Sequence, residues 1–325
     1  MCYNHKKRES GKSMRIVYGI TMAISLMMLI GYVSIIRKKD KWLLAVFVAV
    51  TIVNAGYFML SLAKSVEFAL VSNKIAYFGS VFLPVFMLLT IFDLSRIRYN
   101  KALPISLGVI GALVFALICT TGYLPWYYKE VSLGVADGAS KLIKVYGPAH
   151  VTYLIYLILY FATMIGAIIY SAVKKKVVSK HAILMISVVF GNLAVWFMEQ
   201  RIDLNFEFLS ISYLLSELVL LSIYWMVQDV EKSILQKRVA MGQDVTNEEK
   251  VTLLLTRLPK GESLTQREKE ILMALIENKK RREIAEELNI SENTVKTHMA
   301  HVYDKLGVKG KDELNEILKP TEIKK

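Results

Sequence analysis

Long apolar runs separated by short polar breaks fill the first 228 residues of the chain. Each run approaches the roughly 20 residues that a helix needs to cross a bilayer. The seven runs are 14–36, 42–63, 75–94, 103–123, 150–173, 182–200 and 206–226, and a helical stretch at 66–73 favours an earlier start for the third. This pattern predicts a short tail at 1–13 followed by a seven-helix transmembrane domain at 14–228.

The pattern changes after residue 228. Residues 229–262 are polar and charged with small apolar clusters, which predicts a stalk that continues the seventh helix, an interruption at 242–244 and a hinge at 259–261. In 263–325 apolar residues return at helical spacing, which predicts four short helices. The expected fold class is therefore all-α, a seven-transmembrane bundle with a small C-terminal four-helix domain.

The third of these short helices, expected at 292–306, has two distinct faces. Ser291 is a good N-cap and Gly307 a good terminator. One face is apolar, with Val295, Met299, Val302 and Leu306. The other is polar and small, with Asn293, Lys296, Thr297, Ala300 and Asp304. A cation, a hydroxyl and little bulk are what a helix in the DNA major groove requires.

The helices before it complete a motif. Thr265 and Glu268 fit a capping box that begins the first helix, and Asn278 can adopt the left-handed conformation that ends it. A second helix, expected at 282–288, stops two or three residues before Ser291. This spacing is typical of a helix-turn-helix.

The residues from Leu264 to Val308 resemble the LuxR-type DNA-binding domain. The similarity lies in Leu264-Thr265-x-Arg267-Glu268-x-Glu270-Ile271-Leu272, Glu283-Ile284-Ala285-x-x-Leu288-x-Ile290-Ser291-x-x-Thr294-Val295-Lys296-x-His298 and Lys305-Leu306-Gly307-Val308. It covers about sixty residues, 263–318. The family usually has Gly at Asn278 and Ser-Asn near Lys280-Arg281, and Asn278 preserves the chemistry of the turn.

The resemblance implies two sets of DNA contacts. Base-edge positions are Lys296, Thr297 and Ala300, with Asn293 on the same face. Phosphate positions are Thr294 and His298, with Ser291 and the cations Lys280, Arg281 and Arg282 strengthening the contacts to the backbone. A helical protein-interaction module is the alternative interpretation of this domain.

Charge is distributed unevenly along a chain that is 54% hydrophobic and has a mean hydropathy of +0.40. Residues 1–228 carry 22 Lys/Arg against 10 Asp/Glu, whereas residues 263–325 carry 13 against 12. DNA affinity must therefore come from local patches such as 279–282. Two cysteines, Cys2 and Cys119, build no disulfide scaffold. We expect no metal, no cofactor and no enzymatic site.

The short loops predict the orientation. If the C-terminal domain is cytoplasmic, the inside loops hold 11 cations and the outside loops 6, in agreement with the positive-inside rule. The N-terminus is then outside a bacterial cytoplasmic membrane. The basic tail before Met14 opposes this placement, and a translation start at Met14 is our hypothesis to explain it.

Candidate sensing residues lie in the long outer loop and at depth within the bundle, where Glu217 is about halfway along the seventh segment. The loop 124–149 contains Trp126 and Tyr127, which are expected to be interfacial anchors or to line the mouth of a small-molecule site. Ionisable groups at depth tend to mark function. Glu217 is expected to accept a hydrogen bond from Asn192, to stay protonated or to contact a ligand, in a structural or a sensory role. Glu199 and Glu207 are expected to be boundary residues.

The seven-helix pattern, with Lys74-Ile75-Ala76-Tyr77-Phe78-Gly79 and Pro84, resembles the N-terminal sensor region of some bacterial histidine kinases. The resemblance covers about 200 residues and implies sensing at or outside the membrane. The 34 residues 229–262 contain no phospho-acceptor helix or Gly-rich ATP site and are too short for a receiver domain. A signal would pass directly to the DNA-binding domain.

These observations together predict a membrane-embedded one-component transcription regulator. Its expected partners are double-stranded DNA, the lipid bilayer and an unknown small-molecule or membrane stimulus. A homodimer on DNA is expected because helix-turn-helix units usually read two half-sites. The alternative is a membrane receptor or transporter whose helix-turn-helix tail binds a protein partner.

Overall fold

The chain forms two compact units, Met1–Tyr224 and Trp225–Lys325. The computed structural model describes residues 2–36, 39–136, 138–174, 179–202, 208–241, 243–259 and 262–318. The side chains of residues 2–13 are not among those described.

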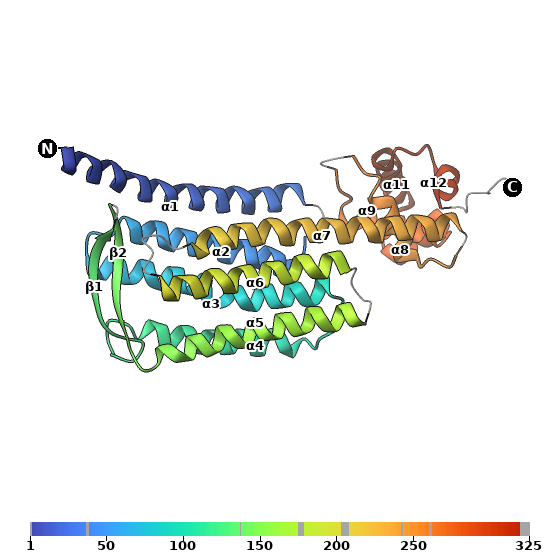
Figure 1. The fold of residues 1–325 in the computed structure, drawn as a ribbon. Coiled ribbons are helices and arrows are strands. Elements are labelled where there is room, and N and C mark those ends of the chain that lie inside the picture. The colour runs from blue at the N-terminus through green and yellow to red at the C-terminus, as the bar shows by residue number, and fades with distance from the viewer. Residues whose placement is uncertain are drawn as a thin grey trace. The chain divides into compact units, whose positions relative to one another are not determined.

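Among the described residues, the first unit contains six long helices and most of the membrane-spanning part of a seventh (Figure 1). They are α1 (Cys2–Ile35), α2 (Lys41–Ser61), α3 (Val66–Leu94), α4 (Ala102–Cys119), α5 (His150–Val173), α6 (Ser179–Arg201) and α7 (Leu209–Ala240). Within the described residues, seven helices have the length and apolar composition of membrane spans. The expected bundle is confirmed, α3 includes the extension before residue 75, and α7 continues past residue 228 into the second unit.

Polar side chains cap the N-termini of two of these helices. Asp40 accepts hydrogen bonds from the backbone N–H groups of Trp42 (2.9 Å) and Leu43 (2.8 Å), which satisfies two free donors of α2. Ser65 accepts one from Phe68 at the start of α3. Pro84 lies inside α3, and the helix continues through it.

Helices α2 and α3 pack closely because glycine leaves room at two points. A Cβ on Gly56 would lie 2.4 Å from the backbone nitrogen of Ala76, and one on Gly79 would lie 2.6 Å from the carbonyl oxygen of Ala49. Membrane helices lack a hydrophobic driving force between them, so close backbone approach through small residues supplies their packing energy. These contacts make α2 and α3 the tightest pair we identify.

A β-hairpin lies within the loop expected at 124–149. Strands β1 (Tyr128–Ala136) and β2 (Ala139–Tyr146) pair antiparallel, with Leu133 opposite Leu142. The hydroxyl of Ser140 donates to the carbonyl of Ala63 (2.6 Å), which fastens the hairpin to the end of α2. The hairpin lies within the expected connection, and its strands follow from the β-branched residues there, a pattern that the sequence prediction did not include.

Within the part of the chain that the structure describes, five short helices follow α7. They are α8 (Asn247–Leu255), α9 (Gln266–Ile276), α10 (Arg281–Leu288), α11 (Glu292–Leu306) and α12 (Lys311–Ile317). Capping boxes begin α8 at Thr246 and α9 at Thr265. Val251 and Leu254 of α8 share one hydrophobic core with α9, α10 and α11, so a helix within the expected stalk packs against the C-terminal helices.

Three residues with positive φ end or join these helices. Asn278 (φ 63°) follows α9, Asn289 (φ 53°) separates α10 from α11, and Gly307 (φ 67°) ends α11. The left-handed conformation expected at Asn278 is confirmed. Asparagine tolerates this conformation better than most residues other than glycine.

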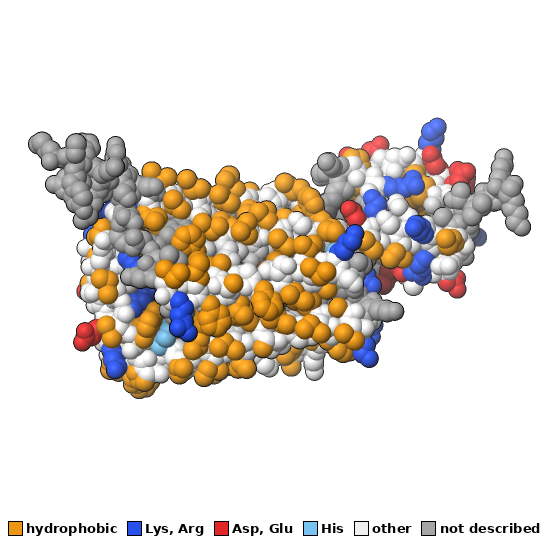
Figure 2. All heavy atoms as spheres, in the orientation of Figure 1, with side chains coloured by type: hydrophobic (Ala, Val, Ile, Leu, Met, Phe, Trp, Pro, Cys, Tyr) orange, Lys and Arg blue, Asp and Glu red, His pale blue; other side chains and the backbone are white. Residues whose placement is uncertain are grey.

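The surfaces of the two units differ (Figure 2). Hydrophobic side chains cover the visible sides of the helical bundle, and its visible charged side chains lie toward its ends. Lys, Arg, Asp and Glu are scattered over the visible face of the C-terminal unit. A surface so apolar suits lipid rather than water.

Candidate nucleic-acid interface and sensing residues

Helix α11 presents the polar face that the sequence predicts. Val295 and Val302 are fully buried in the core of the domain and Leu306 nearly so. On the other side, Asn293, Lys296, Thr297, Ala300 and Asp304 are all exposed. The buried side fixes the rotation of α11, and therefore the exposed side is presented as one continuous strip.

Residues at the start of α11 are ordered by its cap. Ser291 Oγ accepts from the backbone N–H of Thr294 (3.1 Å) and lies 2.8 Å from Thr294 Oγ1. The hydroxyl of Thr297 donates to the carbonyl of Asn293 (3.1 Å). His298 is half-buried, and its ring centroid lies 6.4 Å from that of His301.

The basic run at 279–282 is partly neutralised by neighbouring carboxylates. Lys279 forms ion pairs with Glu277 (2.8 Å) and Glu287 (2.6 Å). Arg282 Nε pairs with Glu286 (3.0 Å). Within the described part of the chain, Lys280 and Arg281 form no ion pair and are exposed. These two cations are therefore the ones most available to an external anion.

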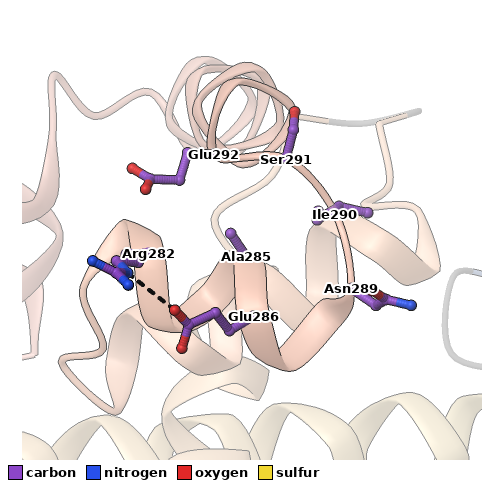
Figure 3. Close-up of a pocket in the computed structure, with 7 residues that line it drawn as sticks. All are labelled: Arg282, Ala285, Glu286, Asn289, Ile290, Ser291 and Glu292. Atoms are coloured by element: carbon purple, nitrogen blue, oxygen red, sulfur yellow. Dashed lines mark hydrogen bonds and ion pairs between the residues drawn. The ribbon is translucent and has the colours of Figure 1, made fainter.

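An open hollow of about 460 Å³ lies where α10 turns into α11 (Figure 3). Arg282 and Glu286 lie on α10, joined by their ion pair, and Ser291 and Glu292 lie at the start of α11. The side chain of Ala285 leaves the middle of the hollow free. Two carboxylates line it, so its electrostatic character is mixed rather than strongly basic.

An ion pair between the buried Glu268 and the half-buried Lys305 holds α9 to α11. Lys305 Nζ donates to both carboxylate oxygens of Glu268, at 2.9 and 2.8 Å. Burial by itself would raise the pKa of Glu268, but the hydrogen bonds from Lys305 and from the Thr265 backbone N–H outweigh it and hold the pKa below its usual value. Glu268 thus completes the capping box and ties the first helix of the motif to the third.

Arg267 makes a second connection. Its guanidinium donates to the carbonyl of Leu288 at the end of α10 and pairs with Glu270 (2.9 Å). A cation at a helix C-terminus satisfies a free carbonyl and favours the helix dipole. Together with Glu268, it fixes α10 and α11 relative to α9.

The two candidate sensing residues of the bundle are buried but not joined. The amide of Asn192 donates to Ser216 Oγ (2.7 Å) and to the carbonyl of Val188, and it accepts from Ser212 Oγ. Glu217 is fully buried, and neither of its carboxylate oxygens has a hydrogen-bond partner among the described residues. The hydrogen bond between Asn192 and Glu217 considered from the sequence is absent from this part of the chain.

The boundary glutamates differ from these. Glu199 Oε1 accepts a hydrogen bond from the backbone N–H of Leu209 (2.8 Å), which connects the end of α6 to the start of α7. Glu207 lies outside the described residues.

The candidate aromatic residues at the hairpin have different surroundings. Trp126 is half exposed, whereas Tyr127 is fully buried. The ring of Tyr127 packs against Tyr77 of α3 (5.7 Å between centroids) and His150 of α5 (5.1 Å). An interfacial anchor would face lipid and water, so that interpretation does not fit Tyr127. The spacing of Tyr153, Tyr156 and Tyr160 along α5 was a signal for this aromatic packing that the sequence interpretation did not use.

Comparison with known proteins agrees with this architecture. Residues 18–227 match the N-terminal 7TM region of histidine kinase, and residues 262–317 match bacterial regulatory proteins, luxR family. Spore germination protein GerE of Bacillus subtilis (strain 168) is 48% identical over 50 residues, which are 15% of this chain and 68% of that protein. No solved structure matches the chain.

These matches confirm both resemblances found in the sequence. The luxR-type domain is that of DNA-binding regulators, and the seven apolar helices are those of a multi-pass membrane protein. The chain belongs to the family that carries the N-terminal 7TM region of histidine kinase, and it ends in a domain of the bacterial regulatory proteins, luxR family.

Proposed function

We propose that the protein is a one-component transcription regulator that senses a stimulus through its membrane bundle and binds DNA through α11. One observation carries the proposal: a luxR-type domain follows a seven-helix region in the same chain. Helix α7 supports it, because it runs unbroken from the membrane span to Ala240. The six residues between α7 and α8 leave room for no further domain.

The exposed strip of α11 supplies the readout. Lys296, Thr297, Ala300 and Asn293 are proposed to face base edges in the major groove, where a cation reads guanine and small side chains admit the thymine methyl. Thr294, His298 and Ser291 contact phosphates beside the groove. Lys280 and Arg281 contact the backbone without reading sequence, and Arg282 does so only when it exchanges Glu286 for phosphate.

The connection between α7 and α8 provides a route for the signal. Arg238, near the end of α7, pairs with Glu249 of α8 (2.7 Å) and donates to the carbonyl of Asp244. Since α8 shares the core of the DNA-binding domain, a shift of α7 acts on that core directly. We propose that a change in the packing of α7 alters how two such domains pair on DNA.

The stimulus is proposed to act within the membrane bundle or at its outer side. Glu217 is the described ionisable group buried on α7 without a partner, and such groups are costly in a membrane and commonly functional. Asn192 links α6 to the same stretch of α7. Trp126 and Tyr127 lie at the hairpin, beside α3 and α5. The orientation that goes with this role has the N-terminus outside the cytoplasmic membrane and the luxR-type domain inside.

Crosslinking and sequencing of DNA bound to the full-length protein in its native cells tests the proposal. Wild type is compared with Lys296→Ala and with a matched control, Lys269→Ala, which removes an exposed lysine from α9. We expect a short recurring DNA site that is lost in Lys296→Ala and kept in the control.

The opposite result has a definite meaning. If neither the wild type nor the control enriches DNA under several growth conditions, the regulator proposal is wrong. The alternative is then a membrane receptor or transporter whose helix-turn-helix domain binds a protein, and α11 would be the surface to test for that partner.

A further inference from the structure

An apolar groove of about 450 Å³ runs between α2 and α3 on the side of the bundle. Its most buried lining residues are small, Ala49 and Gly79, and Ala45 lies beside them. One wall consists of Phe78, Phe82 and Phe86, with neighbouring ring centroids 5.1 and 6.2 Å apart. Phe78 also packs against Phe115 of α4 (5.2 Å between centroids), but Phe78 and Val48 of the lining remain about 40% exposed, so the groove presents an apolar surface that the described residues do not fill.

The groove has one polar end. Lys41 lines its mouth, with its ammonium 4.7 Å from the centroid of the Trp42 ring. Trp42 stacks at 6.4 Å on Phe86, and its indole N–H donates to the hydroxyl of Tyr99 (2.8 Å). An indole and a tyrosine hydroxyl at the end of an apolar groove mark the level of lipid headgroups.

Charges around this mouth are mainly positive. The loop after α3, which Tyr99 ties to the start of α2, carries Arg96, Arg98 and Lys101, and Lys39 precedes α2. Two carboxylates oppose them. Asp40 is engaged in capping α2, and Asp93 accepts a hydrogen bond from Tyr99 (2.8 Å). The described residues here give five cations against two carboxylates.

The length of the groove distinguishes between two candidate occupants, a lipid chain and a transmembrane helix from a second copy. From Lys41 to Ile52 it follows eleven residue steps of α2, about 16 Å at the rise of a helix. That is about half of the roughly 30 Å hydrocarbon core, the depth of one leaflet. A transmembrane helix from a second copy would need a groove along the full span, whereas one lipid chain needs only this depth.

We propose that this groove binds an anionic phospholipid of the bilayer leaflet at the Lys41 end, with one acyl chain along the phenylalanine wall and the phosphate at Lys41. Basic sites between membrane helices recognise anionic headgroups in this way. The proposal depends on the membrane placement of α2 and α3 and not on DNA binding, so it can fail while the proposed function stands.

Native mass spectrometry of the full-length protein in detergent, titrated with phosphatidylglycerol or phosphatidylcholine, tests the site. We expect wild type to bind phosphatidylglycerol about five-fold more tightly, the effect of one lysine near a headgroup. Lys41→Ala should abolish this preference. Lys174→Ala, which removes an exposed lysine from the end of α5, should keep it.

A second pair of variants tests the groove itself. Ala45→Phe should fill it and eliminate the tightly bound lipid, whereas Ala162→Phe, at an exposed position on α5, should not. Unchanged lipid binding in Ala45→Phe, or a preference for phosphatidylglycerol that survives Lys41→Ala, overturns the proposal. A change in oligomeric state without a change in lipid binding assigns the groove to a second copy and also overturns it. If Ala45→Phe does not fold, the Lys41 and Lys174 variants decide alone.

Discussion

Lys280 and Lys296 are exposed lysines of one domain with different proposed roles. Lys296 lies on the strip of α11 that is proposed to face base edges, whereas Lys280 caps α10 through its backbone, which donates to Glu283. A lysine that contacts phosphate contributes to affinity for every sequence and releases counterions. Removing each lysine should therefore change DNA binding in a different way.

Lys280→Ala is predicted to weaken binding to specific and random DNA alike and to reduce the slope of log affinity against log salt by about 1. Fluorescence anisotropy at several salt concentrations measures both quantities. Lys309→Ala, a change at another exposed lysine of the domain, is the control with an unaltered slope. A loss confined to one DNA sequence would contradict the assignment of Lys280 to phosphate.

Glu268→Gln is predicted to destabilise the DNA-binding domain by about 1–3 kcal/mol at pH 7, because Lys305 loses a charged partner. The pKa of Glu268 is lowered in the folded domain, so its contribution is full above the ordinary glutamate pKa of about 4.3 and is lost as pH falls through the folded value. The cost of the substitution should therefore shrink below about pH 4.

Hydrogen exchange of α9 and α11 amides in the full-length protein checks this dependence. Glu316→Gln, in the short helix α12, is the comparison. An equal cost of Glu268→Gln at pH 7 and at low pH would show that the carboxylate charge contributes nothing.

At the scale of elements, the packing of α2 on α3 depends on Gly56. Gly56→Ala is predicted to cost about 1–3 kcal/mol, the usual range for overpacking, because its Cβ would meet the backbone of Ala76. Gly166→Ala in α5 meets nothing within 4 Å and should be neutral or slightly stabilising. Thermal unfolding of both variants in the same detergent makes the comparison, and equal melting temperatures would count against tight packing at Gly56.

What the sequence predicts well is what depends on local pattern. The apolar face of α11, the cap at Thr265 and the turn at Asn278 all follow from residues a few positions apart, and each is confirmed. The hairpin, the docking of α8 and the burial of Tyr127 depend on contacts between distant segments, which no short pattern contains. The ion pairs of the basic run are partly predictable. The spacing of four residues between Arg282 and Glu286 on one helix predicts their pair, which is seen in the structure.

Orientation belongs to the whole molecule and has a direct test. In a chain with Cys2 and Cys119 replaced by serine, Tyr123→Cys, at a position 84% exposed, should react with a membrane-impermeant maleimide on intact cells. Glu248→Cys in α8 should react only after permeabilisation. The reverse pattern would place the luxR-type domain outside and exclude the proposed regulator.

Six residues separate the end of α7 from the start of α8, and they reach at most about 20 Å. Two half-sites one helical turn apart are about 34 Å from each other. Allowing for the radius of each domain, about 12 Å, two copies on one operator must have their membrane bundles within on the order of 100 Å. Binding would then follow the number of copies per area of membrane and not their concentration in the cell. For the proposed regulator, the chromosome would have to come to the bilayer, and a site held away from it would stay unbound however strong its sequence.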